Sequence, residues 1–135
     1  MLGLGKSADN RNMLDAISRS QAVIEFDLEG NILTANSNFC KALGYELAEI
    51  VGKHHRIFCD RDLAASRSYQ EFWESLGRGE FQAKEYRRIR KDGSVIWIEA
   101  SYNPVFRSGK PYKVIKIATD ITAKKIKAVE DAGLL

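Results

Sequence analysis

One segment of the chain, residues 94–106, is apolar on both faces of a strand. It reads SVIWIEASYNPVF, in which Val95 and Trp97 alternate with Ile96 and Ile98. Successive side chains of a β-strand point to opposite faces of a sheet, so this pattern places apolar side chains on each face. We therefore expect a strand that is covered on both sides, by helices on one face and by a terminal helix or a second chain on the other.

Periodicity elsewhere in the chain predicts the remaining elements. They are a helix over 9–18, a hairpin of strands 23–28 and 32–34 around a turn at 29–31, a helix over 38–43, a helical turn over 47–51, a helix over 63–77, strands over 81–90 and 112–121, and a helix from residue 122. Gly44 and Gly52 end the two short helices, and Asp92-Gly93 forms a hairpin turn. Runs of one element type, without strict alternation of strand and helix, favour an α+β fold with an antiparallel sheet.

Composition places the chain among ordinary globular domains. Its 135 residues suffice for one domain, with 44% hydrophobic and 29% charged residues. The net charge of +3 is small, so we expect neither nucleic-acid binding nor membrane insertion. Without a signal peptide, Cys40 and Cys59 are expected to be free thiols in the cytoplasm.

Motifs for hydrolytic or phosphate chemistry are missing, which argues against an enzyme. The two cysteines and the adjacent His54 and His55 lack the spacing of a metal site, so no metal is expected. The basic run RRIRK at residues 87–91 is expected to be a solvated edge of the sheet that blocks stray strand pairing.

Four pieces of the sequence together resemble a PAS sensor domain. They are IEFDLEGNILTANSNFCKALGY, ELAEIVGK, EYRRIRKDGSVIWIEASYNPVF and the terminal TDIT, and they occur in the family's order. The resemblance implies a five-stranded antiparallel sheet of order 2-1-5-4-3 with short flanking helices. It divides the chain into an N-terminal cap helix at residues 1–19, a PAS domain at 20–122 and the start of a signalling helix at 123–135.

Finer features resemble the cytoplasmic PAS domains of bacterial methyl-accepting chemotaxis receptors, including those for aerotaxis and energy taxis. These features are GKHHRIFCD, YQEFWESLGRGEF and IWIEASYNPVF. The resemblance implies that the domain senses redox state, oxygen or a small ligand through a cofactor in its pocket. It also implies a relay through Thr119, Asp120, Ile121 and Thr122 to an output domain, so that the chain is expected to be part of a longer protein.

By resemblance to the flavin-binding receptors, Asn36, Asp62 and Trp73 would hold FAD. Each has a simpler interpretation, because Trp73 suits the core, Asn36 suits a helix cap, and Asp62 (or Asp60) suits the cap of the helix at 63–77. The chain departs from the flavin type where Cys59-Asp60 replaces an Arg-His pair. The cysteine motif of light-oxygen-voltage photosensors is also absent.

Haem is a second cofactor that the family uses, with one histidine as the iron ligand. His54 or His55 would serve, although a surface histidine pair after a glycine turn is the favoured interpretation. The apolar residues that would line such a cavity are Ile24, Phe26, Phe58, Leu63, Phe72, Ile96, Trp97 and Ile115.

Two functions remain open: a cofactor-based sensor, and a cofactor-free module that dimerises and relays a signal. In either case we expect a homodimer through Met13, Leu14 and Ile17 and the outer face of the sheet, to which Ile96 or Ile98 would contribute. Pocket volume separates the two functions, because inward-pointing aromatic residues would leave no room for a cofactor.

Overall fold

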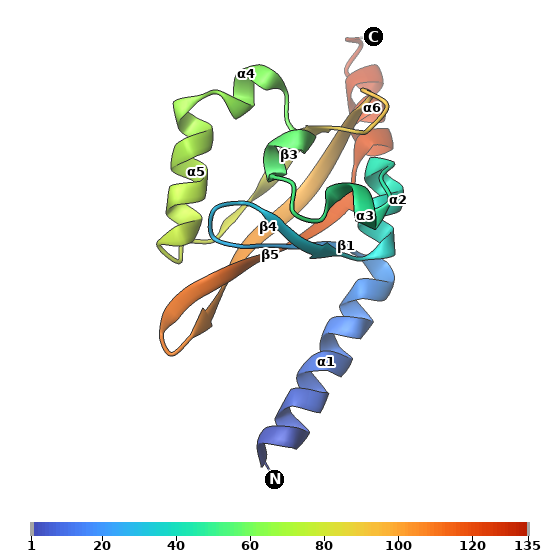
Figure 1. Ribbon diagram of the computed structural model, residues 1–135. Helices are drawn as coiled ribbons and strands as arrows, with labels where there is room; N and C mark the ends of the chain where they lie inside the picture. Colours follow the sequence, from blue (N-terminus) through green and yellow to red (C-terminus); the bar gives the residue numbers. More distant parts are fainter. Residues whose placement is uncertain (1, 135) are drawn as a thin grey trace.

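The computed structural model describes the backbone of residues 2–134 and the side chains of residues 8–134. Its centre is a five-stranded antiparallel sheet of order β2-β1-β5-β4-β3 (Figure 1). The strands are β1 (Ala22–Phe26), β2 (Ile32–Ala35), β3 (Gln82–Ile89), β4 (Val95–Arg107) and β5 (Lys110–Asp120). The helices are α1 (Leu2–Ser20), α2 (Ser37–Leu43), α3 (Leu47–Ile50), the 3-10 helix η1 (His55–Phe58), α4 (Arg61–Ala64), α5 (Arg67–Gly77) and α6 (Thr122–Asp131). The expected α+β class and strand order are confirmed.

The helices from α2 to α5 cover one face of the sheet and enclose the core (Figure 1). Strand β4 sends alternate side chains into this core, and Ile96 and Ile98 are both buried there. The expectation that one of these two isoleucines faces outward is wrong, because they lie two residues apart and therefore share a face. Trp97, between them, lies on the opposite face, where the Lys125 ammonium of α6 is 5.0 Å from its ring centroid.

The first hairpin depends on a glycine at its turn. Gly30 has φ +92°, a conformation that L side chains rarely adopt. A Cβ atom here would lie 2.7 Å from Nε2 of His54 and 2.9 Å from Cε2 of Trp73, which is too close for either. The turn thereby brings the segment before η1 against α5.

The predicted single helix at residues 63–77 is wrong, since the chain forms α4 and α5 with a break between them. Ser66 caps the second helix, and its Oγ accepts a hydrogen bond of 3.2 Å from the Tyr69 N–H. The expected caps are also wrong: Asp60 precedes α4 without a side-chain cap hydrogen bond, and Asp62 is an exposed residue within α4.

Helix α1 extends away from the body of the molecule (Figure 1). Near the end of this helix, the Ser18 carbonyl accepts hydrogen bonds from Asn36, the N-cap of α2, and from Asn38 within α2. A terminal helix was expected on the outer face of the sheet, and α6 covers part of that face, whereas α1 does not cover the outer face of its own sheet. Within residues 2–134, no helix combines the length and the apolar character needed to cross a membrane.

Candidate functional site

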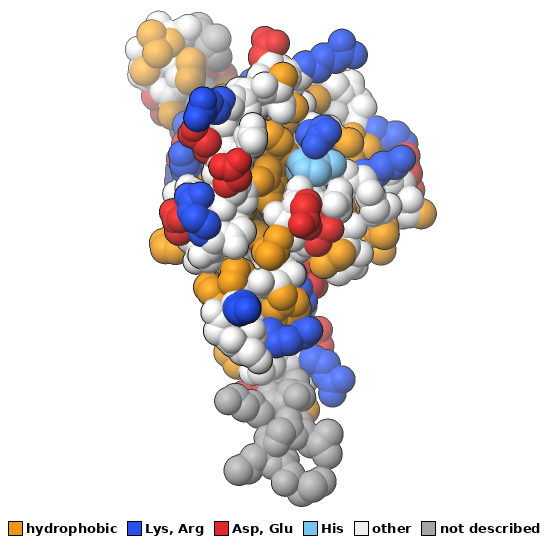
Figure 2. Space-filling model, turned by 60° about the vertical axis from the view of Figure 1, so that its left-hand side comes forward, with side chains coloured by type: hydrophobic (Ala, Val, Ile, Leu, Met, Phe, Trp, Pro, Cys, Tyr) orange, Lys and Arg blue, Asp and Glu red, His pale blue; other side chains and the backbone are white. Residues whose placement is uncertain are grey.

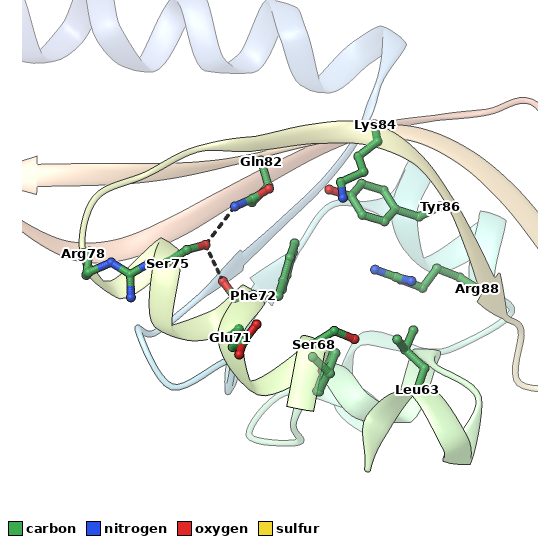
Figure 3. Close-up of a pocket in the computed structure, with 11 residues that line it drawn as sticks. Leu63, Ser68, Glu71, Phe72, Ser75, Arg78, Gln82, Lys84, Tyr86 and Arg88 are labelled. Carbon is green, nitrogen blue, oxygen red and sulfur yellow. Dashed lines mark hydrogen bonds between the residues drawn. The ribbon is translucent and has the colours of Figure 1, made fainter. Parts of the chain in front are cut away.

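A cavity of about 470 Å³ lies between helix α5 and the inner face of strand β3 (Figure 3). This volume falls within the range of small-molecule sites, roughly 300–1,000 Å³. The side chains that line it combine apolar walls with a few polar and charged groups. They are Leu63, Ser68, Tyr69, Glu71, Phe72, Ser75, Arg78, Gln82, Lys84, Tyr86 and Arg88. On the face of the molecule shown in Figure 2, hydrophobic side chains gather in a central band flanked by charged groups.

Two simple periodicities bring these side chains together. On β3, the residues that line the cavity are two apart, from Gln82 to Arg88, so they share the inner face of the strand. On α5, Ser68, Phe72 and Ser75 recur at helical spacing and share the face toward β3. A hydrogen bond of 2.8 Å from Gln82 Nε2 to Ser75 Oγ joins the two elements at one end.

Arg88 lies at the inner end of the cavity with 4% of its surface exposed. Its Nη1 donates to the Arg87 carbonyl at 3.0 Å, and its Nη2 donates to the Tyr102 hydroxyl at 3.1 Å. Its buried Nε and the buried hydroxyl of Tyr86 have no hydrogen-bond partner within residues 8–134. The same part of the chain supplies no carboxylate that forms an ion pair with Arg88. Figure 3 shows its guanidinium group pointing into the space beside Phe72.

His55 connects this region to the centre of the core. Its side chain is fully buried, with Nδ1 2.7 Å from the Tyr69 hydroxyl and Nε2 2.8 Å from the Tyr102 hydroxyl. Burial, together with the positive charges of Lys116 and Arg88, holds the pKa of His55 well below its usual value. This favours the neutral imidazole, which accepts a hydrogen bond from one tyrosine hydroxyl and donates a hydrogen bond to the other.

Another basic residue, Lys116, is buried beside Tyr102. It is 1% exposed, and its Nζ lies 4.9 Å from the ring centroid of Tyr102. Burial, and after it the charge of Arg88, lowers the pKa of Lys116 well below its usual value. Burial also raises the pKa of the neighbouring Cys59 thiol, which argues against a reactive thiolate there.

The residues expected to hold a flavin do not meet in one cavity. The Asn36 side chain is committed to the backbone: its Oδ1 accepts from Val23 and Phe39, and its Nδ2 donates to carbonyls at the end of α1. Asp62 is exposed, and Trp73 lines a different hollow, on the other side of α5. This arrangement does not fit a flavin site built from these three residues.

The remaining aromatic candidates are also separated. Phe58 is fully buried against Phe39, with ring centroids 5.2 Å apart. Trp97 and Ile115, expected inside the pocket, lie on the outer face of the sheet, because each alternates with inward-facing neighbours.

The histidines do not fit a haem site. His54 Nε2 lies 2.8 Å from the Glu29 carbonyl, and its Nδ1 accepts the Arg56 N–H at 3.0 Å. Both ring nitrogens of His55 are taken up by tyrosine hydroxyls, so neither histidine presents a free nitrogen to iron. The prediction of a surface histidine pair is wrong for His55, which is fully buried, whereas His54 is half-buried.

Sequence reasoning missed the basic residues of the site. The run at residues 87–91 does lie at the edge of the sheet, but Arg88 is not solvated. The burial of Lys116 was not predicted, because attention went to the apolar residues of β5. Its spacing of two from Val114 and from Ala118, both buried, was the available signal.

The expected relay residues form the junction between β5 and α6, which is bonded to β4. The Trp97 N–H donates to Thr122 Oγ1 at 2.9 Å, and the Ile121 N–H donates to the Trp97 carbonyl at 2.8 Å. Asp120 Oδ1 accepts the Thr122 N–H at 2.9 Å, and Thr119 Oγ1 lies 2.7 Å from the Gln21 side chain. The first residues of α6 are thus fixed to the outer side of the strand whose inner side chains enter the core.

Comparison with known proteins gives a consistent result. The profile of the family described as PAS fold matches residues 32–118. Biofilm dispersion protein BdlA of Pseudomonas aeruginosa is 46% identical over 113 residues, which cover 83% of this chain and 27% of that protein. The aerotaxis receptor of Escherichia coli is 32% identical over 104 residues, which cover 77% of this chain and 20% of the receptor. The chain therefore spans about a quarter of the length of these relatives or less.

Solved structures show the same fold at lower sequence identity. The PAS domain of a protein from Colwellia psychrerythraea superimposes with a TM-score of 0.73 at 21% identity, over 84% of this chain and 97% of that one. A light-oxygen-voltage domain superimposes with a TM-score of 0.71 at 20% identity, over 90% and 93% of the two chains.

Proposed function

Since the chain belongs to the PAS family, we propose that it is the sensor domain of a chemotaxis-type signal transduction protein. In this proposal an occupant of the cavity between α5 and β3 changes the junction between β5 and α6. No enzymatic step is involved. The observation that carries the proposal is the hydrogen bond from the Trp97 N–H to Thr122 Oγ1, 2.9 Å long, because it fixes the start of α6 to the strand next to β3.

The path from cavity to junction is short. In the register of β3 and β4, Arg88 is opposite Ile96, and Arg87 is opposite Trp97. An occupant that displaces β3 at Arg88 therefore acts on the residues that hold Thr122. A difference in binding free energy of about 1–3 kcal/mol between two positions of the junction is enough for a sensor of this kind.

The signal in this proposal is a small ligand. The resemblance to aerotaxis receptors pointed to redox or oxygen sensing through FAD or haem. The side chains expected to hold those groups are, however, dispersed or engaged in other hydrogen bonds. The cavity beside Arg88, by contrast, has unsatisfied polar atoms that a ligand would satisfy.

A second candidate function, a cofactor-free module for dimerisation and relay, is favoured by the aromatic filling of the core. Phe26 and Trp73 pack edge to face with ring centroids 5.3 Å apart, and Phe39 and Phe58 do so at 5.2 Å. This packing fills the centre of the domain with side chains, so an occupant of the cavity between α5 and β3 would distinguish the two functions.

The assembly that we propose is a homodimer in the cytoplasm, with an output domain beyond α6. Met13 is 58% exposed and Ile17 38% exposed on the protruding helix α1, and Leu14 is partly exposed beside them. The partner surface would be the outer face of the sheet, where Ile117 and Thr119 lie in a shallow hollow. Burial of such side chains contributes roughly 1.5–3 kcal/mol each.

The test is a fusion of the chain, through α6, to a histidine-kinase output with measurable activity. Ser68→Trp places an indole over the cavity, whereas Arg67→Trp puts the same group on the neighbouring residue of α5, which does not line it. A sensor domain changes kinase activity in the Ser68 variant and not in the Arg67 variant. Equal activity in both would leave only the dimerisation and relay function.

A further inference from the structure

We propose that the cavity between α5 and β3 binds a small organic monocarboxylate, with its carboxylate on Arg88 and its apolar part against Phe72. The inference deepens the proposed function, because it names the class of ligand for the same cavity.

The need for a negative charge comes from Arg88 itself. A guanidinium group does not lose its proton in proteins, so Arg88 carries a full positive charge although it is 4% exposed. Buried charges are ordinarily paired, because an unpaired ion loses its hydration without compensation. Within residues 8–134 the partners of Arg88 are a backbone carbonyl, a tyrosine hydroxyl and the ring of Tyr86, whose centroid lies 4.8 Å from Cζ, and all three are neutral. An anion in the adjoining cavity would compensate the charge.

Two buried donors of residues that line the cavity remain without a hydrogen-bond partner in the described part of the chain. The Nε–H of Arg88 is buried without a partner, and the guanidinium group faces the cavity beside Phe72 (Figure 3). The Tyr86 hydroxyl, also buried and unpartnered, belongs to a side chain that lines the same cavity. Arginine recognises carboxylates through adjacent N–H groups, and a nearby hydroxyl provides a further donor.

The charge count favours a monoanion over a phosphate. Four polar side chains of the described part of the chain are buried: His55, Ser75, Arg88 and Lys116. Of these four, Ser75 and Arg88 line the cavity, and Arg88 is the one of the two that carries a charge. A carboxylate balances that single charge, whereas a dianion would bring an unpaired negative charge into the core.

Charged groups at the rim do not replace the ligand. Glu71 lines the cavity, but its carboxylate accepts from Arg67 at 3.1 Å, away from Arg88. Arg78 is paired with Glu80 at 2.7 Å. Lys84 is exposed and lines the cavity, where its ammonium adds to the attraction for an anion.

The walls select an apolar body. Leu63, Phe72 and the ring of Tyr86 line the cavity, and Phe72 packs edge to face on Tyr102 with ring centroids 4.8 Å apart. A ring or short hydrocarbon chain attached to the carboxylate would cover Phe72 and displace water from it.

The experiment is a titration of the full chain, followed by the amide signals of residues 84–88 and by calorimetry. The probes are benzoate, phenylacetate and hexanoate, each with its neutral amide, and phenyl phosphate. We expect saturable binding of at least one carboxylate, with its amide and phenyl phosphate weaker. In Arg88→Met the binding falls by roughly 10- to 100-fold, as expected for the loss of hydrogen bonds to a charged group. The control Arg87→Met, which removes the same charge on the other face of β3, keeps the affinity.

Each alternative outcome overturns the assignment. Failure of all three carboxylates to bind removes the site, equal binding of the amides removes the role of charge, and unchanged affinity in a folded Arg88→Met variant removes Arg88. Tighter binding of phenyl phosphate would replace the carboxylate class by a phosphate. These outcomes are seen in the ligand titration, which follows residues 84–88 of β3. Failure of the proposed function is seen separately, as unchanged kinase activity of the Ser68→Trp fusion.

Discussion

The backbone N–H of Trp97 donates a hydrogen bond of 2.9 Å to the side-chain hydroxyl of Thr122. One partner belongs to β4, whose inner side chains enter the core, and the other is the first residue of α6. The bond makes the position of α6 sensitive to any displacement of β4. Because its acceptor is the side chain of Thr122, a single substitution removes it.

Removal of this hydroxyl is expected to loosen the junction without unfolding the domain. In Thr122→Ala the Trp97 N–H loses its partner, which costs about 1 kcal/mol for a typical hydrogen bond and increases hydrogen exchange at this amide about fivefold. The measurement is residue-resolved hydrogen exchange. Thr34→Ala, at an exposed position of β2, is the control and should leave the Trp97 amide unchanged. Equal exchange in the two variants would mean that Thr122 does not hold the strand.

His55 predicts a loss of stability in mild acid. Burial lowers its pKa in the folded state, so below the usual value of 6.5 the unfolded chain binds a proton that the folded chain does not. The free energy of unfolding therefore falls as the pH drops below 6.5, and the contribution of His55 approaches about 1.4 kcal/mol per pH unit. Urea unfolding at pH 7.5, 6.5 and 5.5, conditions set by that reference pKa of about 6.5, measures it.

The variant His55→Gln replaces the imidazole with an amide, which can still hydrogen-bond to the two tyrosines but does not titrate. The stability of this variant should therefore depend less on pH between about 7.5 and 5.5. His54→Gln is the matched control. Its imidazole is half-buried and its pKa is lowered by burial to a smaller extent, so most of the dependence should persist. Parallel curves for the wild type and His55→Gln would contradict the assignment.

For Lys116 we predict that mutation increases the stability of the domain. At neutral pH the unfolded chain protonates this amine and the folded chain disfavours the proton, so Lys116 lowers the free energy of unfolding. Lys116→Met should raise that free energy by roughly 1 kcal/mol or more at pH 7, and the gain should shrink as the pH approaches 10.5. Lys110→Met, at an exposed position, should give no comparable gain. A loss of stability in Lys116→Met would show that the amine has a favourable role in the core.

The exposed apolar side chains of α1 predict a self-association that depends on them. In Ile17→Glu the charge would have to be buried in the proposed dimer, so the dissociation constant should rise at least about tenfold. Sedimentation equilibrium compares this variant with Asn12→Glu, which adds the same charge at another exposed position of α1. An equal effect of both substitutions would indicate repulsion by net charge rather than contact through Ile17.

The sheet could be read from the sequence because its signals are local. The apolar run of residues 95–98 indicates β4, and the turn at Gly93, with φ +87°, occurs where Asp92-Gly93 predicted it. The helix break before α5 was not predicted because two alanines, both good helix formers, precede Ser66. The capping role of Ser66 depends on the direction in which the chain leaves α4, which the sequence does not show.

The candidate site was harder to predict because burial of Arg88 is a tertiary effect. Its neighbours Arg87 and Arg90 predict a solvated run, whereas Arg88 is buried on the inner face of β3, where Phe72 and Tyr102 pack on Tyr86. The cofactor residues carried over from the family failed for the same reason. Asn36 and the two histidines are engaged by hydrogen bonds that no local pattern displays.

The most direct test of the account is hydrogen exchange at the Ile121 amide, which donates to the Trp97 carbonyl at 2.8 Å. We predict that filling the cavity with Ser68→Trp changes the exchange rate of this amide severalfold, as a shift of about 1 kcal/mol in local stability would. The control Arg67→Trp should leave it at the wild-type rate. An unchanged Ile121 amide in a folded Ser68→Trp variant would contradict the claim that the cavity and the departing helix are coupled.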